Sequence, residues 1–141
     1  YQSYALDGSS VDESGHGTHV AGSIAGYCTG GSCSGVTKYN GMAYNAKLAF
    51  IDLTNTNDGG VLTPSNLNAN LFSVLYGYGA RVQSHSWASD ETYYDSSAYH
   101  ADRFMYDNSD ALLLFAAGTV CGQYFCVRVV VTFLSMYRVC R

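Results

Sequence analysis

Short apolar runs alternate with stretches of helical spacing over the first 118 residues of the chain. Uninterrupted apolar runs of four to eight residues are typical of buried strands, and apolar residues three and four positions apart are typical of helices packed on a core. The pattern predicts loops over 1–15 and 27–46, helices over 16–26, from 64 to the glycines at 77 and 79, and over 97–108, and strands over 47–53, 81–86 and 111–117.

The order strand, helix, strand, helix, strand after residue 46 is typical of a parallel sheet with helical crossovers. The fold class predicted from the pattern is therefore α/β. Thr63 is a suitable N-cap and Pro64 a suitable first residue for the middle helix. The last helix presents small and apolar residues on one face: Ala98, Ala101 and Met105.

Length and composition indicate a single globular domain. The chain has 141 residues, of which 48% are hydrophobic and 13% charged. Its net charge of −4 provides no basic surface, so we expect no nucleic-acid partner. The chain starts at Tyr1 and shows no signal peptide, and we interpret it as part of a longer protein, the parent protein. We expect no membrane association, and the sequence assigns no oligomeric state.

The composition changes after Gly118. Residues 119–141 contain three of the five cysteines, three arginines and no Asp or Glu. The apolar run over 129–137 is too short for a transmembrane helix. This tail is either a hairpin or buried strand, or a segment foreign to the fold. We favour the second and divide the chain into a domain over 1–118 and an atypical tail over 119–141.

The cysteine count is odd, so the cysteines cannot all pair within one chain. Cys28 and Cys33 flank the flexible sequence TGGS, which makes them candidates for a small disulfide, the alternative being two free thiols. A disulfide is typical of an oxidising compartment.

The sequence DESGHGTHVAG, residues 12–22, places His16 at the start of a helix of small residues. The positive end of a helix dipole favours a neutral imidazole, the form that acts as a general base. The eleven residues resemble the histidine motif of the subtilisin-like serine proteases, the subtilases. That resemblance implies that His16 is the catalytic base and that His19 is similar to the family's structural histidine.

Two further segments resemble the same family in the same order. Residues 41–53, GMAYNAKLAFIDL, look like the strand that follows the histidine helix. Residues 79–88, GARVQSHSWA, are similar to one wall of the substrate cleft. There the backbone of Ser86, Trp87 and Ala88 would pair with an extended peptide. Ala88 replaces a usual glycine, and ordinary core packing is the alternative role of the Trp87 ring.

The run LLFAAG, residues 113–118, resembles the strand leading to the family's oxyanion-hole asparagine, in the motif A-A-G-N. Here Thr119 stands at the asparagine position. Its hydroxyl is shorter and is no obvious substitute for an amide donor. In subtilisin itself, loss of that donor lowers turnover by about 10²–10³. The resemblance covers residues 12–118.

The family's triad requires Asp, His and Ser in that chain order. Asp7 and Asp12 precede His16, but neither follows a predicted strand, so we expect the triad aspartate to lie before Tyr1. The G-T-S-x-A-x-P segment that carries the family's serine is absent from the chain. Without that nucleophile no acyl-enzyme forms, and we expect the chain alone to be inactive. We also expect Asp12 to favour a basic residue near the cleavage point.

The resemblance implies a three-layer α/β fold, a parallel sheet with helices on both faces, of which this chain holds only part. Open strand edges then favour aggregation, so we expect marginal stability in isolation. It also implies a serine endopeptidase that acts on polypeptide substrates and is secreted or lumenal. We expect no required cofactor. Structural calcium is common in the family, but no acidic cluster places it in this sequence.

Two other classes stay open. A pseudoprotease that binds peptides without cleaving them is favoured by Thr119. A zinc module would use His16, His19, Cys28 and Cys33 as four ligands, although this spacing matches no usual zinc arrangement. We therefore assign no metal ligand.

Overall fold

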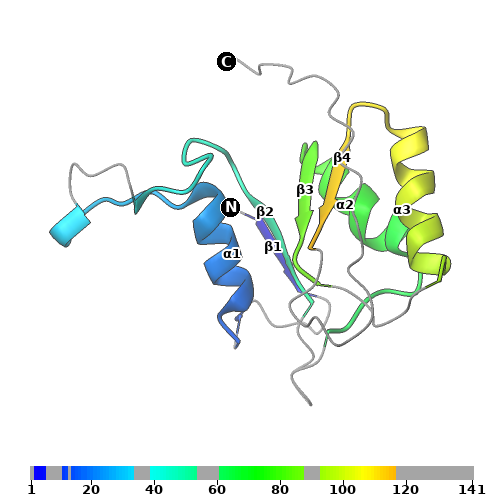
Figure 1. Cartoon of the computed structure of the whole chain (residues 1–141), viewed down its shortest axis with the longest axis horizontal. Coiled ribbons are helices and arrows are strands. Elements are labelled where there is room, and N and C mark those ends of the chain that lie inside the picture. Colours follow the sequence, from blue (N-terminus) through cyan, green and yellow to red (C-terminus); the bar gives the residue numbers. More distant parts are fainter. Residues whose placement is uncertain are drawn as a thin grey trace.

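A computed structural model of the chain describes residues 2–5, 11–12, 14–33, 39–53, 61–87 and 93–116 (Figure 1). Its elements in chain order are β1 (Gln2–Ala5), α1 (His16–Ala25), the 3₁₀ turn η1 (Gly31–Cys33), β2 (Ala49–Asp52), the π-helical turn η3 (Asn68–Phe72), α2 (Ser73–Gly77), β3 (Val82–His85), α3 (Ser96–Asp107) and β4 (Leu112–Phe115).

The four strands form two parallel pairs. β1 pairs with β2, with Gln2 opposite Ala49, and β3 pairs with β4, with Val82 opposite Leu112. Parallel neighbours need a crossover connection, and α3 provides it between β3 and β4. Figure 1 shows α1 on the side of β1 and β2, and α2 and α3 on the side of β3 and β4. The predicted α/β class with parallel strands is confirmed, as part of a larger fold.

The buried core lies where α3, η3 and α2 meet β4. Its largest fully buried side chains are Phe72 and Phe104, whose ring centroids lie 5.5 Å apart. The remaining buried apolar residues of this cluster are Leu67, Leu71, Leu75 and Leu113. The core therefore draws on residues 67–113, and the first half of the chain packs against its edge.

One strand was not predicted. Residues 1–15 read as a loop, but Gln2–Ala5 form β1. The run QSYA is short and lacks both an apolar stretch and a clear alternation, so its local pattern carries little strand signal. Its conformation follows from pairing with β2 along its whole length.

The middle helix starts later than predicted. Thr63 does not cap a helix at Pro64; helical structure begins at Leu67. The side chain of Asn66 accepts a hydrogen bond from the backbone N–H of Ala69 at 3.0 Å, which is the contact expected of an N-terminal cap. The later start places Leu67, which is only 2% exposed, on the core side of the helix.

The inner face of the last helix agrees with the predicted one at Ala98 and Ala101, which are partly buried, and differs at Met105. Phe104 is fully buried, Ala101 packs against the core, and Met105 is 37% exposed. The helix begins after Asp95, whose side chain accepts from the backbone N–H of Ala98 at 2.8 Å. The buried residue of the last turns is therefore Phe104, which the prediction did not include, and not its neighbour Met105.

Candidate active site

Helix α1 begins at the histidine singled out by the sequence motif. Gly15 precedes it with φ of 71°, a left-handed conformation that glycine adopts without steric cost. The backbone N–H of His16 donates to Oγ of Ser14 at 3.2 Å, and the N–H of Thr18 donates to Oδ2 of Asp12 at 2.6 Å. These bonds satisfy donors that the first turn of a helix otherwise leaves without partners.

Glycines bring α1 close to its neighbours. A Cβ at Gly17 would lie 2.7 Å from the ring of Phe50 in β2. A Cβ at Gly41 would lie 2.7 Å from backbone atoms at the end of α1, and the N–H of Gly41 donates to the carbonyl of Gly26 at 2.7 Å. No residue of α1 is buried. The helix is therefore held by backbone bonds and close approach rather than by core side chains.

A cavity of about 710 Å³ is lined by residues of α1, β2 and β3. His16 of α1 and the predicted cleft residues Ser86 and Trp87, which follow β3, all line it. Apolar side chains such as Val20 and Ile51 also contribute to its wall. The structure thus brings together three residues that lie up to 71 positions apart in the sequence, His16 and Ser86–Trp87. We call this cavity the slot.

The exposure of the two motif histidines leaves both side chains accessible. His16 and His19 are both exposed, and of the two only His16 lines the slot. Two other predicted site residues, Ala88 and Thr119, lie outside the described residues. Their predicted roles in the cleft wall and at the oxyanion position stay predictions.

The ring of Trp87 packs against other aromatic rings. Its centroid lies 5.6 Å from that of Phe115 and 5.9 Å from that of His85, both in edge-on arrangements. Its Nε1 is buried and has no hydrogen-bond partner among the described residues. The ring therefore has a packing role, the alternative role given above for Trp87. Pairing of the Trp87 backbone with a peptide stays a prediction.

Strand β3 turns polar residues inward, which the sequence pattern did not reveal. Gln83 and His85 are buried, while Val82 and Ser84 are exposed. Burial lowers the pKa of His85 to about 4, because desolvation disfavours the charged imidazolium. The side-chain amide of Gln83 donates to the carbonyl of Phe72 at 3.0 Å. Burial alternates with period two along β3, but both inward residues are polar, opposite to the usual apolar-in arrangement.

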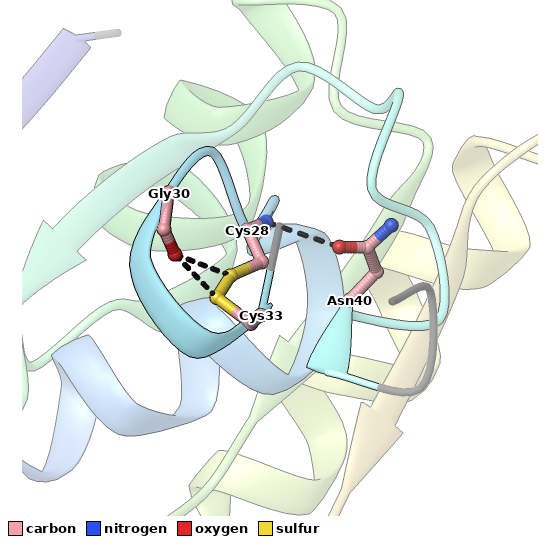
Figure 2. The surroundings of a disulfide bond; sticks show 4 residues. All are labelled: Cys28, Gly30, Cys33 and Asn40. Carbon is pink, nitrogen blue, oxygen red and sulfur yellow. Dashed lines mark hydrogen bonds between the residues drawn. A yellow bond between two sulfur atoms is a disulfide. The ribbon is translucent and has the colours of Figure 1, made fainter. Parts of the chain in front are cut away.

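The two candidate cysteines form a disulfide just beyond the end of α1 (Figure 2). The Cα atoms of Cys28 and Cys33 lie 6.0 Å apart, and both sulfur atoms lie close to the carbonyl oxygen of Gly30. The backbone N–H of Cys28 donates to Oδ1 of Asn40 at 3.0 Å, which ties the loop to the segment that follows it. Neither cysteine lines the slot.

The disulfide also bears on the zinc hypothesis. Zinc is bound by thiolates, and the sulfur atoms of Cys28 and Cys33 are joined to each other. Within the described ranges no group of three or more His, Cys, Asp or Glu side chains is arranged to hold a metal ion. In the same ranges no helix has the length and apolar character needed to cross a membrane.

Comparison with known proteins decides the family. The sequence profile of the Subtilase family matches residues 2–123. The chain belongs to the subtilase family. Two similar curated proteins, both from Dictyostelium discoideum, are the serine protease/ABC transporter B family proteins tagD and tagA. The first is 37% identical over 109 residues, 74% of this chain, and the second is 35% identical over 114 residues, 79% of this chain.

This subtilase chain spans only 6% of the length of each of those relatives. The family predicted from the histidine motif is confirmed. The slot places the motif histidine of this subtilase segment in one cavity with the predicted cleft residues Ser86 and Trp87.

Proposed function

We propose that the chain is the histidine-bearing segment of a serine endopeptidase and that His16 is its general base. The observation that carries the proposal is the placement of His16 at the exposed start of α1, on the slot it shares with Ser86. In this reaction the imidazole takes the proton of a serine hydroxyl as that oxygen attacks the peptide carbonyl. It then returns the proton to the leaving amine, so the peptide bond breaks and an acyl-enzyme forms.

We propose that the triad aspartate lies on a further strand that occupies the slot. β2 pairs with β1 and β3 with β4, and among the described strands neither β2 nor β3 has a partner on its other side. A further parallel strand in the slot would join the two pairs into one sheet. Such a strand would lie in the slot that His16 and all four residues of β2 line, which supports a triad aspartate close to His16. The parent protein would supply this strand with the aspartate, and a separate segment with the serine.

The substrate would be an extended polypeptide that adds to the backbone of residues 86–88. Strand addition of this kind uses backbone hydrogen bonds for affinity and side-chain pockets for specificity. Ser86 and Trp87 follow directly on β3 and line the slot, which supports an extended substrate beside His16. Because Thr119 replaces the oxyanion asparagine, we expect a lower turnover, by about 10²–10³ if the lost donor is not replaced.

The Cys28–Cys33 disulfide supports a secreted or lumenal location, since disulfides persist in oxidising compartments. The chemistry of the triad needs no cofactor. A structural calcium ion, which is common in the family, is not assigned to any residue of this chain.

The test is peptide hydrolysis by the parent protein. His16→Ala should lower turnover by about 10⁶-fold, the loss seen in subtilisin when its catalytic histidine is removed. His100→Ala, on α3 and away from the slot, is the matched control and should keep full turnover. The isolated chain should show no turnover. A parent protein whose His16→Ala variant cleaves peptides as well as the unmodified protein would contradict the proposal.

The alternative function is peptide binding without cleavage, which Thr119 favours. In that case the parent protein would bind an extended peptide, and His16→Ala would leave both binding and the absent turnover unchanged. Labelling of the parent protein by a fluorophosphonate, which reacts with an activated serine, separates the two functions. A labelled serine supports the endopeptidase, and its absence supports the peptide-binding relative.

A further inference from the structure

We propose that Asp12 is a positioning residue for His16 and acts through the first turn of α1. This inference deepens the proposed function and rests on it, since the rate that Asp12 would affect is that of the proposed hydrolysis. It differs from the expectation, drawn from the sequence, that Asp12 selects a basic residue in the substrate. The two roles use the carboxylate differently: one binds its oxygens within the protein, and the other presents its charge to substrate on the slot, which Asp12 also lines.

Both oxygens of the Asp12 carboxylate are engaged within the protein. Oδ2 accepts from the backbone N–H of Thr18 at 2.6 Å. Oδ1 accepts from the backbone N–H of Gly15 at 3.0 Å and from the hydroxyl of Ser14 at 3.1 Å. Asp12 therefore joins residues on both sides of His16 to a single rigid group.

A second contact extends this arrangement to His16 itself. The hydroxyl of Ser14 donates to Asp12 and accepts from the backbone N–H of His16 at 3.2 Å. The two successive hydrogen bonds, from Ser14 to Asp12 and from His16 to Ser14, thus fix the backbone of His16. The exposed side chain of His16 stays free to meet substrate on the slot. A displacement of about 1 Å in a catalytic group is enough to lower a rate by about 10²-fold.

The composition of α1 explains why this anchor lies outside the helix. The cap position is Gly15, which has no side chain to accept a bond, and the first turn contains no acidic residue. No residue of α1 is buried, so core packing does not fix the start of the helix. In α3, by contrast, Asp95 is itself the cap residue and Phe104 is fully buried. α3 is therefore fixed both by its own cap residue and by core packing, whereas the start of α1 is fixed by the hydrogen bonds of Asp12.

The ionisation of Asp12 favours the same role. The hydrogen bond from the Thr18 side chain is the largest cause that lowers the pKa of Asp12, and bonds from the backbone of Thr18, from Ser14 and from Gly15 add to it against a smaller desolvation. The carboxylate is thus charged at neutral pH, and its bonds to backbone donors are charge-assisted and therefore stronger than neutral ones.

The experiment compares, in the parent protein, two aspartates that accept bonds from the first turn of a helix: Asp12 at α1 and Asp95 at α3. Asp12→Ala should lower kcat by about 10- to 100-fold and leave KM unchanged, because the histidine is displaced while the cleft is intact. Asp12→Asn keeps one of the two acceptor oxygens and should recover part of the kcat lost in Asp12→Ala. The matched control is Asp95→Ala, which removes the equivalent cap of α3 and should lower thermal stability to a similar degree without changing kcat.

Two further measurements keep the test decisive if Asp12→Ala folds poorly. Ser14→Ala removes the hydroxyl that links Asp12 to the N–H of His16, leaves the bonds from Asp12 to Gly15 and Thr18 in place, and should lower kcat with KM unchanged. Amide hydrogen exchange should show faster exchange at Thr18 in Asp12→Ala and an intermediate rate in Asp12→Asn. Exchange at Thr18 does not depend on catalysis, so it tests the anchor even where the parent protein is inactive.

The outcomes separate this inference from the proposed function. If His16→Ala keeps turnover, the proposed function fails. If His16→Ala abolishes turnover but Asp12→Ala matches Asp95→Ala in kcat, the positioning role fails alone. A rise in KM confined to substrates with a basic residue near the cleavage point would also overturn it, in favour of a specificity role for Asp12.

Discussion

The two halves of this subtilase segment are stabilised in different ways. The core half, residues 61–116, contains every residue of the buried apolar cluster. The histidine half, residues 2–53, carries His16 on a helix without a single buried residue. The core half is fixed by packing of large side chains, and the histidine half by hydrogen bonds, glycines and a disulfide. The residue expected to do the chemistry, His16, therefore lies on the half with the weaker side-chain packing.

The contrast has a physical reason in the sequence of α1. Its residues are small, with Gly17 and Gly22 among them, so the helix approaches β2 closely but buries little apolar surface. Burial contributes roughly 25 cal/mol per Å² of apolar surface, which gives α1 little of the stabilisation that Phe72 and Phe104 give the core half. Specific bonds from Asp12 and Ser14 take its place.

The largest test of the comparison removes a core ring. Phe104→Ala should lower the free energy of unfolding of the parent domain by about 3–5 kcal/mol, because it deletes a fully buried side chain and leaves a cavity. Ile24→Ala in α1 should cost less than half of that, since Ile24 is only partly buried. Urea denaturation followed by circular dichroism measures both. Equal losses would show that the histidine half is packed as firmly as the core half.

A second test uses acid to destabilise the protein through His85, a buried residue of the core half. The pKa of His85 is about 4 in the folded chain and about 6.5 in an unfolded one, so the unfolded state binds a proton first as the pH falls. Its contribution to stability is present above pH 6.5 and is lost as the pH falls towards 4. The loss amounts to up to about 3 kcal/mol, and urea titrations between pH 7 and pH 4 measure it.

His85→Phe is the matched variant for this titration. His85 stacks on Phe115 at 4.8 Å between ring centroids, so a phenylalanine keeps the aromatic contact and removes the titrating group. The variant should lose most of the pH dependence between 6.5 and 4. A slope as steep as that of the unmodified protein would assign the acid sensitivity to other groups.

The smallest expected effects come from two glycines: Gly22 within α1, and Gly41, which contacts the end of that helix. Gly41→Ala should lower stability by about 1–3 kcal/mol, because its Cβ would meet backbone atoms of Gly22, Ala25 and Gly26 at 2.7 Å. Gly22→Ala has no atom within 4 Å of its new Cβ and should be neutral or stabilising by up to about 1 kcal/mol. Thermal denaturation distinguishes the signs. Two losses of equal size would mean that close approach does not hold this half together.

The sequence predicted the elements of the core half well, because apolar residues dominate their pattern. The strands at 81–86 and 111–117 and the helix at 97–108 appear as β3, β4 and α3, within a few residues. The pattern was less informative about which of several neighbouring residues is buried on a helix or caps it. The pattern placed Met105 and not Phe104 on the inner face of the last helix, and it placed the cap at Thr63 instead of Asn66, because only tertiary packing distinguishes neighbouring residues of similar propensity.

The histidine half was predictable through its motif and not through its physical pattern. The resemblance of residues 12–22 gave His16, the helix and the family. β1 was missed because its strand conformation depends on pairing with β2, 47 positions away in the register of Gln2 and Ala49. The contacts of Asp12 were missed as well, since an aspartate four residues before a helix has no fixed partner in sequence alone.

The disulfide loop at the end of α1 gives a site for inserting new sequence. Gly30 and Gly31 lie at its tip, both are exposed, and a Cβ at either position would meet open space. Exposed loop tips with small residues tolerate insertion best. His16 begins the ten-residue helix α1 and the loop follows the end of that helix, so the length of α1 separates the two. A peptide tag or a fluorophore inserted between Gly30 and Gly31 would therefore mark the protein for imaging or capture while the histidine end of the helix stays unmodified.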